Sequence, residues 1–184
     1  MIPYVREDEY VKIVGKATNF ETALQAPISK RSCVYYHVIV ERRAHKSWIK
    51  IIDDELFQNF HIVADGEKAL INLNLSRKNC KVLNIVSDHA VDSNLFKDAS
   101  EAFEQYLNTQ NTDSKNLLGL NRELRYTERI IEIDEEIAVM GIGKWKNDSK
   151  NKSTNEKQLM LYGTEKRKLY VTDDPKAMKQ VRRN

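Results

Sequence analysis

The chain has 184 residues, of which 41% are hydrophobic and 31% are charged, so it holds enough apolar material for a core, which argues against global disorder. A formal net charge of +3 is too small to indicate a nucleic-acid partner by itself. No run approaches the roughly 18 apolar residues of a membrane span, and the first residues lack the apolar centre of a signal peptide. We therefore expect the chain itself to be soluble.

The charge is distributed unevenly along the chain. Residues 144–184 hold 12 Lys and Arg against 5 Asp and Glu, a net charge of +7, which leaves a net charge of −4 for residues 1–143. The sequence therefore predicts a mildly acidic body followed by a basic C-terminal segment.

An apolar period of two, typical of β-strands, dominates the first part of the chain. It predicts a strand over residues 9–17, with Gly15 at a bulge or bend. The next strand, over residues 33–43, has two largely apolar faces, and such a strand is expected to be central and covered on both sides. One face carries Val34, Tyr36, Val38 and Val40, and the other carries Cys33, Tyr35, His37 and Ile39.

Residues 47–52 and 60–75 continue the β pattern. Asp65-Gly66 lies between two apolar runs and is the strongest hairpin signal in the chain, because a tight turn needs a positive φ that Gly adopts without strain. Residues 80–88 are predicted to form a further strand.

The apolar period changes to three or four between residues 94 and 107, which predicts one inserted helix of about 14 residues. Ser93 is its expected N-cap, since a serine hydroxyl there accepts a hydrogen bond from the first turn. Residues 108–122 are polar and are predicted to form a loop.

Strand patterns return in the last third of the chain. Residues 123–134 and 136–145 are two predicted strands. Residues 157–163 and 167–172 are expected to form a last hairpin around Gly163.

A short helix is predicted at the C-terminus, because Asp173 or Asp174 can cap it and Pro175 fits its first turn. The pattern as a whole predicts a mainly β (α+β) fold, an OB-like barrel or a sandwich of short antiparallel strands, with the inserted helix and the short C-terminal helix. We expect one domain over residues 1–172 and a basic helix over residues 173–184.

The residues that could carry chemistry are dispersed. Neither a CxxC nor an HxxxH spacing occurs, so we predict no metal ligands and no cofactor. Cys33 has no catalytic signature around it and lies in a strand expected to be buried, so it is predicted to pack as a small hydrophobe. A disulfide between Cys33 and Cys80 would require an oxidising compartment. The histidines are His37, His45, His61 and His89.

Two further catalytic or phosphate-binding motifs are absent. The sequence contains no G-x-S-x-G element. Gly141 and Gly143 precede Lys144, but they lack the spacing of a Walker loop and lead into a polar loop. We therefore predict no catalytic residues.

An OB-like barrel that binds single-stranded nucleic acid is an alternative, because such barrels place aromatic side chains in a basic groove. Trp48 between Lys46 and Lys50 fits that pattern loosely. The net charge of −4 over residues 1–143 weighs against it.

The ordered features resemble the GIDE-type domain, also called "beside a membrane", which lies between two membrane spans in proteins such as the mitochondrial ubiquitin ligase mulan. The resemblance covers roughly residues 9–145 and depends on the order and spacing of motifs that are individually weak. These motifs are the strand with Gly15, Ala26-Pro27, residues 33–36, Trp48, the turn at Asp65, Gly119, and residues 124–143 with Arg125, Glu128 and Gly141.

This resemblance implies a membrane-anchored full-length protein from which this chain is an excised piece, with the domain on the extracytoplasmic side. The basic segment over residues 173–184 would then lie near anionic lipid head groups. The RING of the ligases needs many zinc-binding cysteines, and this chain has two, so ubiquitin ligase activity is not implied.

We therefore expect a non-enzymatic binding or sensor domain that recognises an unknown protein or small ligand. The candidate partner-binding residues are Tyr35, Tyr36, Trp48, Arg125 and Glu128. The alternatives are the nucleic-acid-binding barrel and an uncharacterised hydrolase or thiol enzyme built from dispersed residues.

Overall fold

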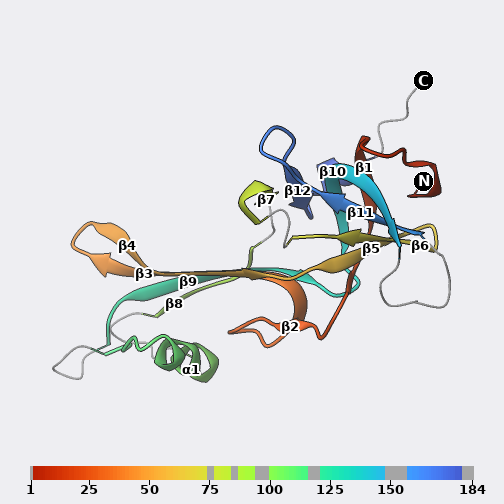
Figure 1. Ribbon diagram of the computed structural model, residues 1–184. Coiled ribbons are helices and arrows are strands. Elements are labelled where there is room, and N and C mark those ends of the chain that lie inside the picture. Colours follow the sequence, from red (N-terminus) through yellow and green to blue (C-terminus); the bar gives the residue numbers. More distant parts are fainter. Residues whose placement is uncertain are drawn as a thin grey trace.

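The computed structural model describes residues 2–73, 77–83, 87–93, 100–115, 121–147 and 157–179. It contains two β-sheets, one closed into a barrel and the other extended (Figure 1). One helix packs on the extended sheet, and a short helix lies near the C-terminus.

The barrel is closed because β1 pairs with both β5 and β10. Its strands follow the order β1-β5-β6-β11-β10-β1, and only the β6–β11 pair is parallel. This order is that of an OB-like barrel, and the predicted mainly β, OB-like fold is confirmed. The barrel strands are β1 (Tyr10–Asn19), β5 (Phe60–Ala64), β6 (Glu67–Ile71), β10 (Glu136–Asn147) and β11 (Lys157–Tyr162).

Two backbone features of the barrel, one turn and one close approach between strands, follow directly from local sequence. Asp65 and Gly66 have φ values of 52° and 81° and join β5 to β6, as the hairpin signal predicted. Gly15 lies where β1 leaves β10 and begins to pair with β5. A Cβ atom on Gly15 would lie 2.2 Å from the carbonyl oxygen of Val63, so only glycine fits this close approach.

Two strands extend the barrel sheet beyond β10: β12 (Leu169–Thr172) and β7 (Cys80–Val82). β12 and β11 pair with the same edge of β10, one after the other, and not with each other. The predicted hairpin around Gly163 is therefore wrong. The reason is that β10, with 12 residues, is long enough to accept both short strands on one edge.

The second sheet, which we call the blade, consists of β2 (Leu24–Gln25), β3 (Ser32–Ala44), β4 (Ser47–Phe57), β8 (Ser87–Ser93) and β9 (Leu124–Glu132). β3 is central, because β4 pairs with one of its edges and β9 with the other. The predicted central position of this strand is confirmed, but the expected cover on both of its faces is wrong. Helix α1 (Glu101–Thr109) packs on one face, and the blade extends away from the barrel (Figure 1). His37 and Ile39, on the face opposite α1, are only half-buried.

The two faces of the blade belong to different environments. Even-numbered residues of β3 such as Val38 and Val40 pack with α1 in a buried apolar cluster. Near the barrel, Val34, Tyr35 and Ile131 join the barrel core, so the apolar interior is continuous where the blade meets the barrel. The cluster beneath α1 consists of Ile28, Val38, Val40, Ile52, Phe103, Tyr106, Leu107, Leu124 and Tyr126.

A β-bulge changes the face on which Cys33 lies. The register between β3 and β9 shifts between Cys33 and Tyr35. Cys33 therefore packs with Ala26 and Ile130, and Tyr36 lies against the same cluster. Tyr35 lies instead in the barrel core. The prediction that Cys33 and Tyr35 share a face is wrong, because strict alternation takes no account of an extra residue.

Both helices are capped by side chains. Ser100 is the N-cap of α1 and accepts a hydrogen bond from the backbone N–H of Phe103. The predicted N-cap, Ser93, is instead the last residue of β8, and residues 94–99 of the predicted helix lie outside the described residues. The C-terminal helix α2 (Pro175–Met178) is confirmed, with Asp174 as its N-cap. Residues 180–184 of the predicted basic helix also lie outside the described residues.

Two single-turn 3-10 helices complete the described elements: η1 (Ile2–Tyr4) and η2 (Arg77–Asn79).

Candidate functional site

The five predicted partner-binding residues are divided between the two faces of the blade. Tyr35 is buried in the core, where its hydroxyl donates a hydrogen bond to Glu55 Oε1 at 2.9 Å and its ring stacks on Phe57. Burial raises the pKa of Tyr35, and the Glu55 carboxylate raises it further. Tyr35 therefore anchors the core through its hydroxyl.

Glu128 lies on the opposite face of the blade and is fully buried. Its carboxylate accepts hydrogen bonds from the backbone N–H groups of the turn that follows Pro27, from Ile28 at 2.8 Å and from Ser29 at 3.1 Å. These bonds tie the turn to β9. In this structure Glu128 serves the fold and does not reach the surface.

Tyr36 also faces the α1 side and is half-buried between two apolar clusters. Its pKa is raised by burial and then by the nearby carboxylate of Asp54. Asp54 Oδ2 also accepts a hydrogen bond from the hydroxyl of Tyr106 on α1 at 3.1 Å. This polar pair fastens the helix to β4, so the α1 face acts as a packed interior.

The other face of the blade, which we call the open face, brings Trp48 and Arg125 together. The guanidinium carbon of Arg125 lies 4.4 Å from the centroid of the Trp48 ring, and that of Arg43 lies 5.4 Å from it. Arg125 Nε also donates to Glu41 Oε2 at 2.6 Å, and this bond lowers the pKa of Glu41. The result is a tryptophan ring in contact with two cations.

Strand register produces this cluster. Arg43 lies opposite Trp48 in the β3–β4 pair, and Glu41 lies opposite Arg125 in the β3–β9 pair. The sequence predicted Trp48 and Arg125 from separate motifs, whereas Arg43 and Glu41 were not predicted. Their signal was the period of two along β3, which places both on the same face.

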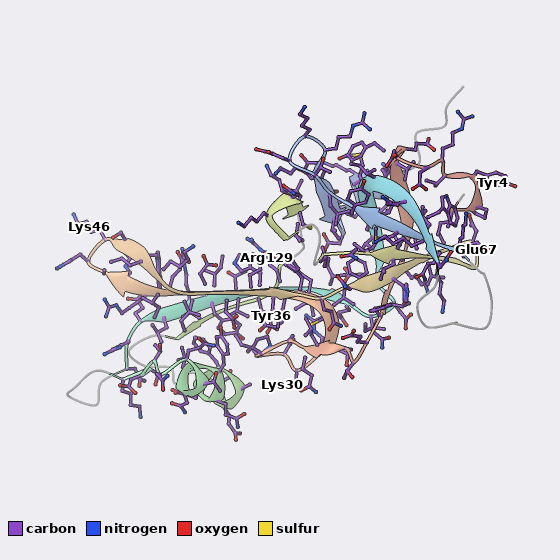
Figure 2. All side chains as sticks on the ribbon, in the orientation of Figure 1. Tyr4, Lys30, Tyr36, Lys46, Glu67 and Arg129 are labelled. Atoms are coloured by element: carbon purple, nitrogen blue, oxygen red, sulfur yellow. The ribbon has the colours of Figure 1, made fainter. Side chains whose placement is uncertain are left out.

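Further along the open face, three side chains form a second polar cluster. His37 Nε2 lies 2.7 Å from Asp53 Oδ1, and Lys50 Nζ donates to Asp53 Oδ2. Both contacts lower the pKa of Asp53, and the bond from Lys50 has the larger effect. Figure 2 shows Arg129 on this side of the blade and Tyr36 on the side of α1. The open face is therefore a charged surface with an aromatic residue towards its far end.

The two cysteines offer no nucleophile at neutral pH. Both are free, and Cys33 has no exposed surface, so its predicted packing role is confirmed. Burial, followed by the charge of Glu128, raises the pKa of Cys33 to about 11. Burial likewise raises the pKa of Cys80 to about 12. A thiol at either position remains protonated and unreactive near pH 7.

Within the described ranges, no group of three or more His, Cys, Asp or Glu side chains is placed to hold a metal ion. Within the same ranges, no helix combines the length and apolarity needed to cross a membrane.

A concave surface lies on the outside of the barrel beside α2. Its volume is about 300 Å³, and Leu83, Met140, Tyr170 and Ala177 are among its lining residues. Lys12 closes one side by donating a hydrogen bond to the carbonyl oxygen of Ala177 at 2.6 Å. This bond holds the end of α2 against the barrel.

Comparison with protein-family models, with curated proteins and with solved structures finds no significant match to this chain. The chemistry of its surfaces is therefore the basis for assigning a function.

Proposed function

We propose that this chain is a non-enzymatic binding module that recognises a protein partner on the open face of the blade. The observation that carries the proposal is the contact of the Trp48 ring with the guanidinium groups of both Arg43 and Arg125. Tryptophan and arginine are the residues most enriched among those that dominate binding energy. Because the two cations already restrict the ring, little additional side-chain entropy is lost when a partner binds.

The arrangement of the two faces supports this role. The α1 face is filled by packed side chains, and its buried carboxylate, Glu128, is bonded to backbone groups. The charged side chains of the open face, such as Glu41 and Asp53, are instead arranged along a surface that α1 does not cover. A partner can therefore bind there without disturbing the core.

A thiol enzyme is the alternative that the local chemistry supports least. Cys33 is sealed inside the blade, and the raised pKa values of Cys33 and Cys80 keep both sulfur atoms protonated at neutral pH. Acid–base catalysis would need two titratable groups whose environments separate their pKa values within a shared cavity. The 300 Å³ concave surface has Lys12 as its one titratable cation and no carboxylate among its lining residues.

Photocrosslinking tests the proposed binding face. A photoreactive amino acid in place of Trp48 should trap one partner in cells, and adding Arg125→Ala should weaken that crosslink. The matched control places the same amino acid at Tyr4, which is 85% exposed and belongs to η1 at the barrel end. The same crosslinks from both positions, or none from Trp48, would contradict the proposal.

The cellular setting is a further part of this proposal and depends on the resemblance to GIDE-type domains. We infer that the full-length protein is membrane-associated, with this domain on the extracytoplasmic side and the basic segment over residues 173–184 near lipid head groups. Alkaline extraction of membranes from cells that express the full-length protein tests the association. Release of the protein into the soluble fraction would contradict membrane association. The orientation is tested by adding a protease on the extracytoplasmic side, which should digest the domain.

The nucleic-acid alternative has one observation in its favour, the OB-like strand order of the barrel. The net charge of −4 over residues 1–143 opposes the electrostatic term that dominates such binding. We expect no binding in a titration with a single-stranded oligonucleotide at low salt. Tight binding that weakens steeply with salt would replace the proposed function with this one.

A further inference from the structure

β4 is the edge strand of the blade. Among the described elements it pairs with β3 over its whole length, and no strand pairs with its outer side. At 11 residues it is long for an edge strand, and its outer N–H and C=O groups form a template for another strand. Figure 1 shows the β3–β4 hairpin at the end of the blade that lies farthest from the barrel.

Apolar side chains are exposed along this edge. Ile49 is 47% exposed and Leu56 is 37% exposed, and together they are two of the four large apolar side chains exposed among the described residues. Both lie on the α1 side of the blade, because they are opposite Arg42 and Tyr36 of β3. Exposed apolar residues at an unpaired edge are typical of an interaction surface.

The sequence of β4 is complementary to itself in an antiparallel arrangement. Ile51 is the extra residue of a bulge, since Ile52 lies opposite Val40 while the next residue of β3, Glu41, lies opposite Lys50. When Ile51 is left out of the ladder, a two-fold axis at Asp53 aligns two copies of β4. The pairs then formed twice across the axis are Trp48–Phe57, Ile49–Leu56, Lys50–Glu55 and Ile52–Asp54.

Each of these pairs joins side chains on the same face of the blade. Trp48, Phe57, Lys50 and Glu55 are opposite odd-numbered residues of β3 and lie on the open face, whereas Ile49 and Leu56 are opposite even-numbered ones. Three of the four pairs are therefore aromatic with aromatic, aliphatic with aliphatic, and cation with anion, which are the cross-strand combinations that stabilise sheets. The fourth pair, Ile52 with Asp54, is not complementary.

We propose that two copies of this chain associate through their β4 edges about an axis at Asp53. Charges and bulges also serve to prevent edge pairing, but here the cation and the anion are placed so that each meets its opposite in the second copy. The two Asp53 carboxylates face each other at the axis, and each is already paired with its own Lys50, with His37 Nε2 2.7 Å away. The dimer joins two blades into one sheet and does not depend on the proposed binding function.

Charge substitutions in the aliphatic pair test the dimer by sedimentation equilibrium. Ile49→Lys alone and Leu56→Glu alone should each weaken the dimer about tenfold, because each replaces both copies of an apolar pair. The double variant should regain most of that loss, since lysine then faces glutamate across both contacts. Leu83→Glu, an exposed apolar residue of the barrel end, is the control and should leave the dimer unchanged.

Crosslinking tests the position of the axis. Residues directly opposite each other in a sheet have Cα atoms about 5 Å apart, within reach of a disulfide. Asp53→Cys should therefore form a covalent dimer under mild oxidation, whereas Ser47→Cys, on the same strand but far from the axis, should not. Background from Cys33 and Cys80 is low because both thiols are buried or half-buried with raised pKa values.

Three outcomes would overturn the inference. The first is a monomer at high micromolar concentration, which would leave the edge for another protein. The second is a dimer that Ile49→Lys does not weaken, which would place the interface elsewhere. The third is equal crosslinking at positions 53 and 47, which would indicate random collision.

Discussion

Removing the buried carboxylate of Glu128 is the strongest test of how the blade is held together. Glu128→Ala leaves the backbone N–H groups of Ile28 and Ser29 without the acceptor that they have at 2.8 and 3.1 Å. A buried donor that loses its acceptor costs about 1–3 kcal/mol. We therefore expect Glu128→Ala to lower the free energy of unfolding by about 4 kcal/mol, a large share of the about 5–15 kcal/mol of a typical domain.

A smaller change separates the hydrogen bonds from the packing. Glu128→Gln keeps the shape of the side chain and one acceptor oxygen, but it places an amide donor against a backbone donor. We expect a loss of about 2 kcal/mol, since one of the two charge-assisted bonds is removed and the other becomes neutral. The desolvation of the charged carboxylate partly offsets both losses, because the variants no longer bury a charge.

Urea unfolding followed by circular dichroism measures these differences, with Glu67→Ala as the matched control. Glu67 is exposed on β6, so its replacement should change the free energy of unfolding by less than about 0.5 kcal/mol. Native-state hydrogen exchange should show that the amides of Ile28 and Ser29 lose protection in Glu128→Ala. A loss below about 1 kcal/mol, or unchanged exchange at both amides, would refute the reasoning.

Three further predictions concern the barrel, the interior and the helix. Gly15→Ala should destabilise the fold by at least about 2 kcal/mol, measured by urea unfolding, because its Cβ would lie 2.2 Å from the Val63 carbonyl oxygen. The folded pKa of Cys33, about 11, exceeds the value of about 8.5 in an unfolded chain, so its contribution to stability is present below pH 8.5 and is lost as pH rises towards 11. Cys33→Ala should reduce that decline in a series of unfolding curves, and an unchanged pH profile would contradict the assignment. Tyr106→Phe should cost about 1 kcal/mol by removing the donor to Asp54, with exchange rising first in the amides of α1, and uniform exchange would argue against a local role.

The barrel could be predicted from sequence because its signals are local. The period of two marks the strands, and Asp65-Gly66 fixes a hairpin by its backbone preference alone. The hairpin around Gly163 failed for a non-local reason. A Cβ there would lie 2.4 Å from the backbone nitrogen of Leu169 and 2.6 Å from the carbonyl oxygen of Asn79, so this glycine allows a close crossing of segments. A glycine at a crossing and a glycine in a turn look alike in sequence.

The start of α1 shows a similar ambiguity. Ser93 and Ser100 carry the same hydroxyl, and the apolar residues between them continue the helical period. The choice between the two caps depends on where β8 ends, and β8 runs to Ser93 because it pairs with β9. Pairing with a strand distant in sequence therefore decided the boundary, and no local pattern contains that information.

The candidate site was predicted in part, because only its separate members were visible in the sequence. Trp48 and Arg125 were each selected, but their contact results from the register of β4 and β9 on either side of β3. Glu128 was selected as a partner-binding residue from the motif that resembles GIDE-type domains. It is buried because the turn after Pro27 presents two backbone donors to it, and a sequence pattern does not show where a turn folds back.

The polar residues of the blade divide by face in a way that links stability to recognition. On the α1 face, Glu128 and Asp54 each bind a segment outside their own strand, a backbone turn and a helix tyrosine respectively. On the open face, Glu41 and Asp53 bind cations within the sheet. Substitutions on the α1 face should therefore reduce stability and binding together, because they release packed segments. Substitutions such as Trp48→Ala should reduce binding with little change in unfolding, and a set of variants in which the two quantities always change together would show that the open face has no separate role.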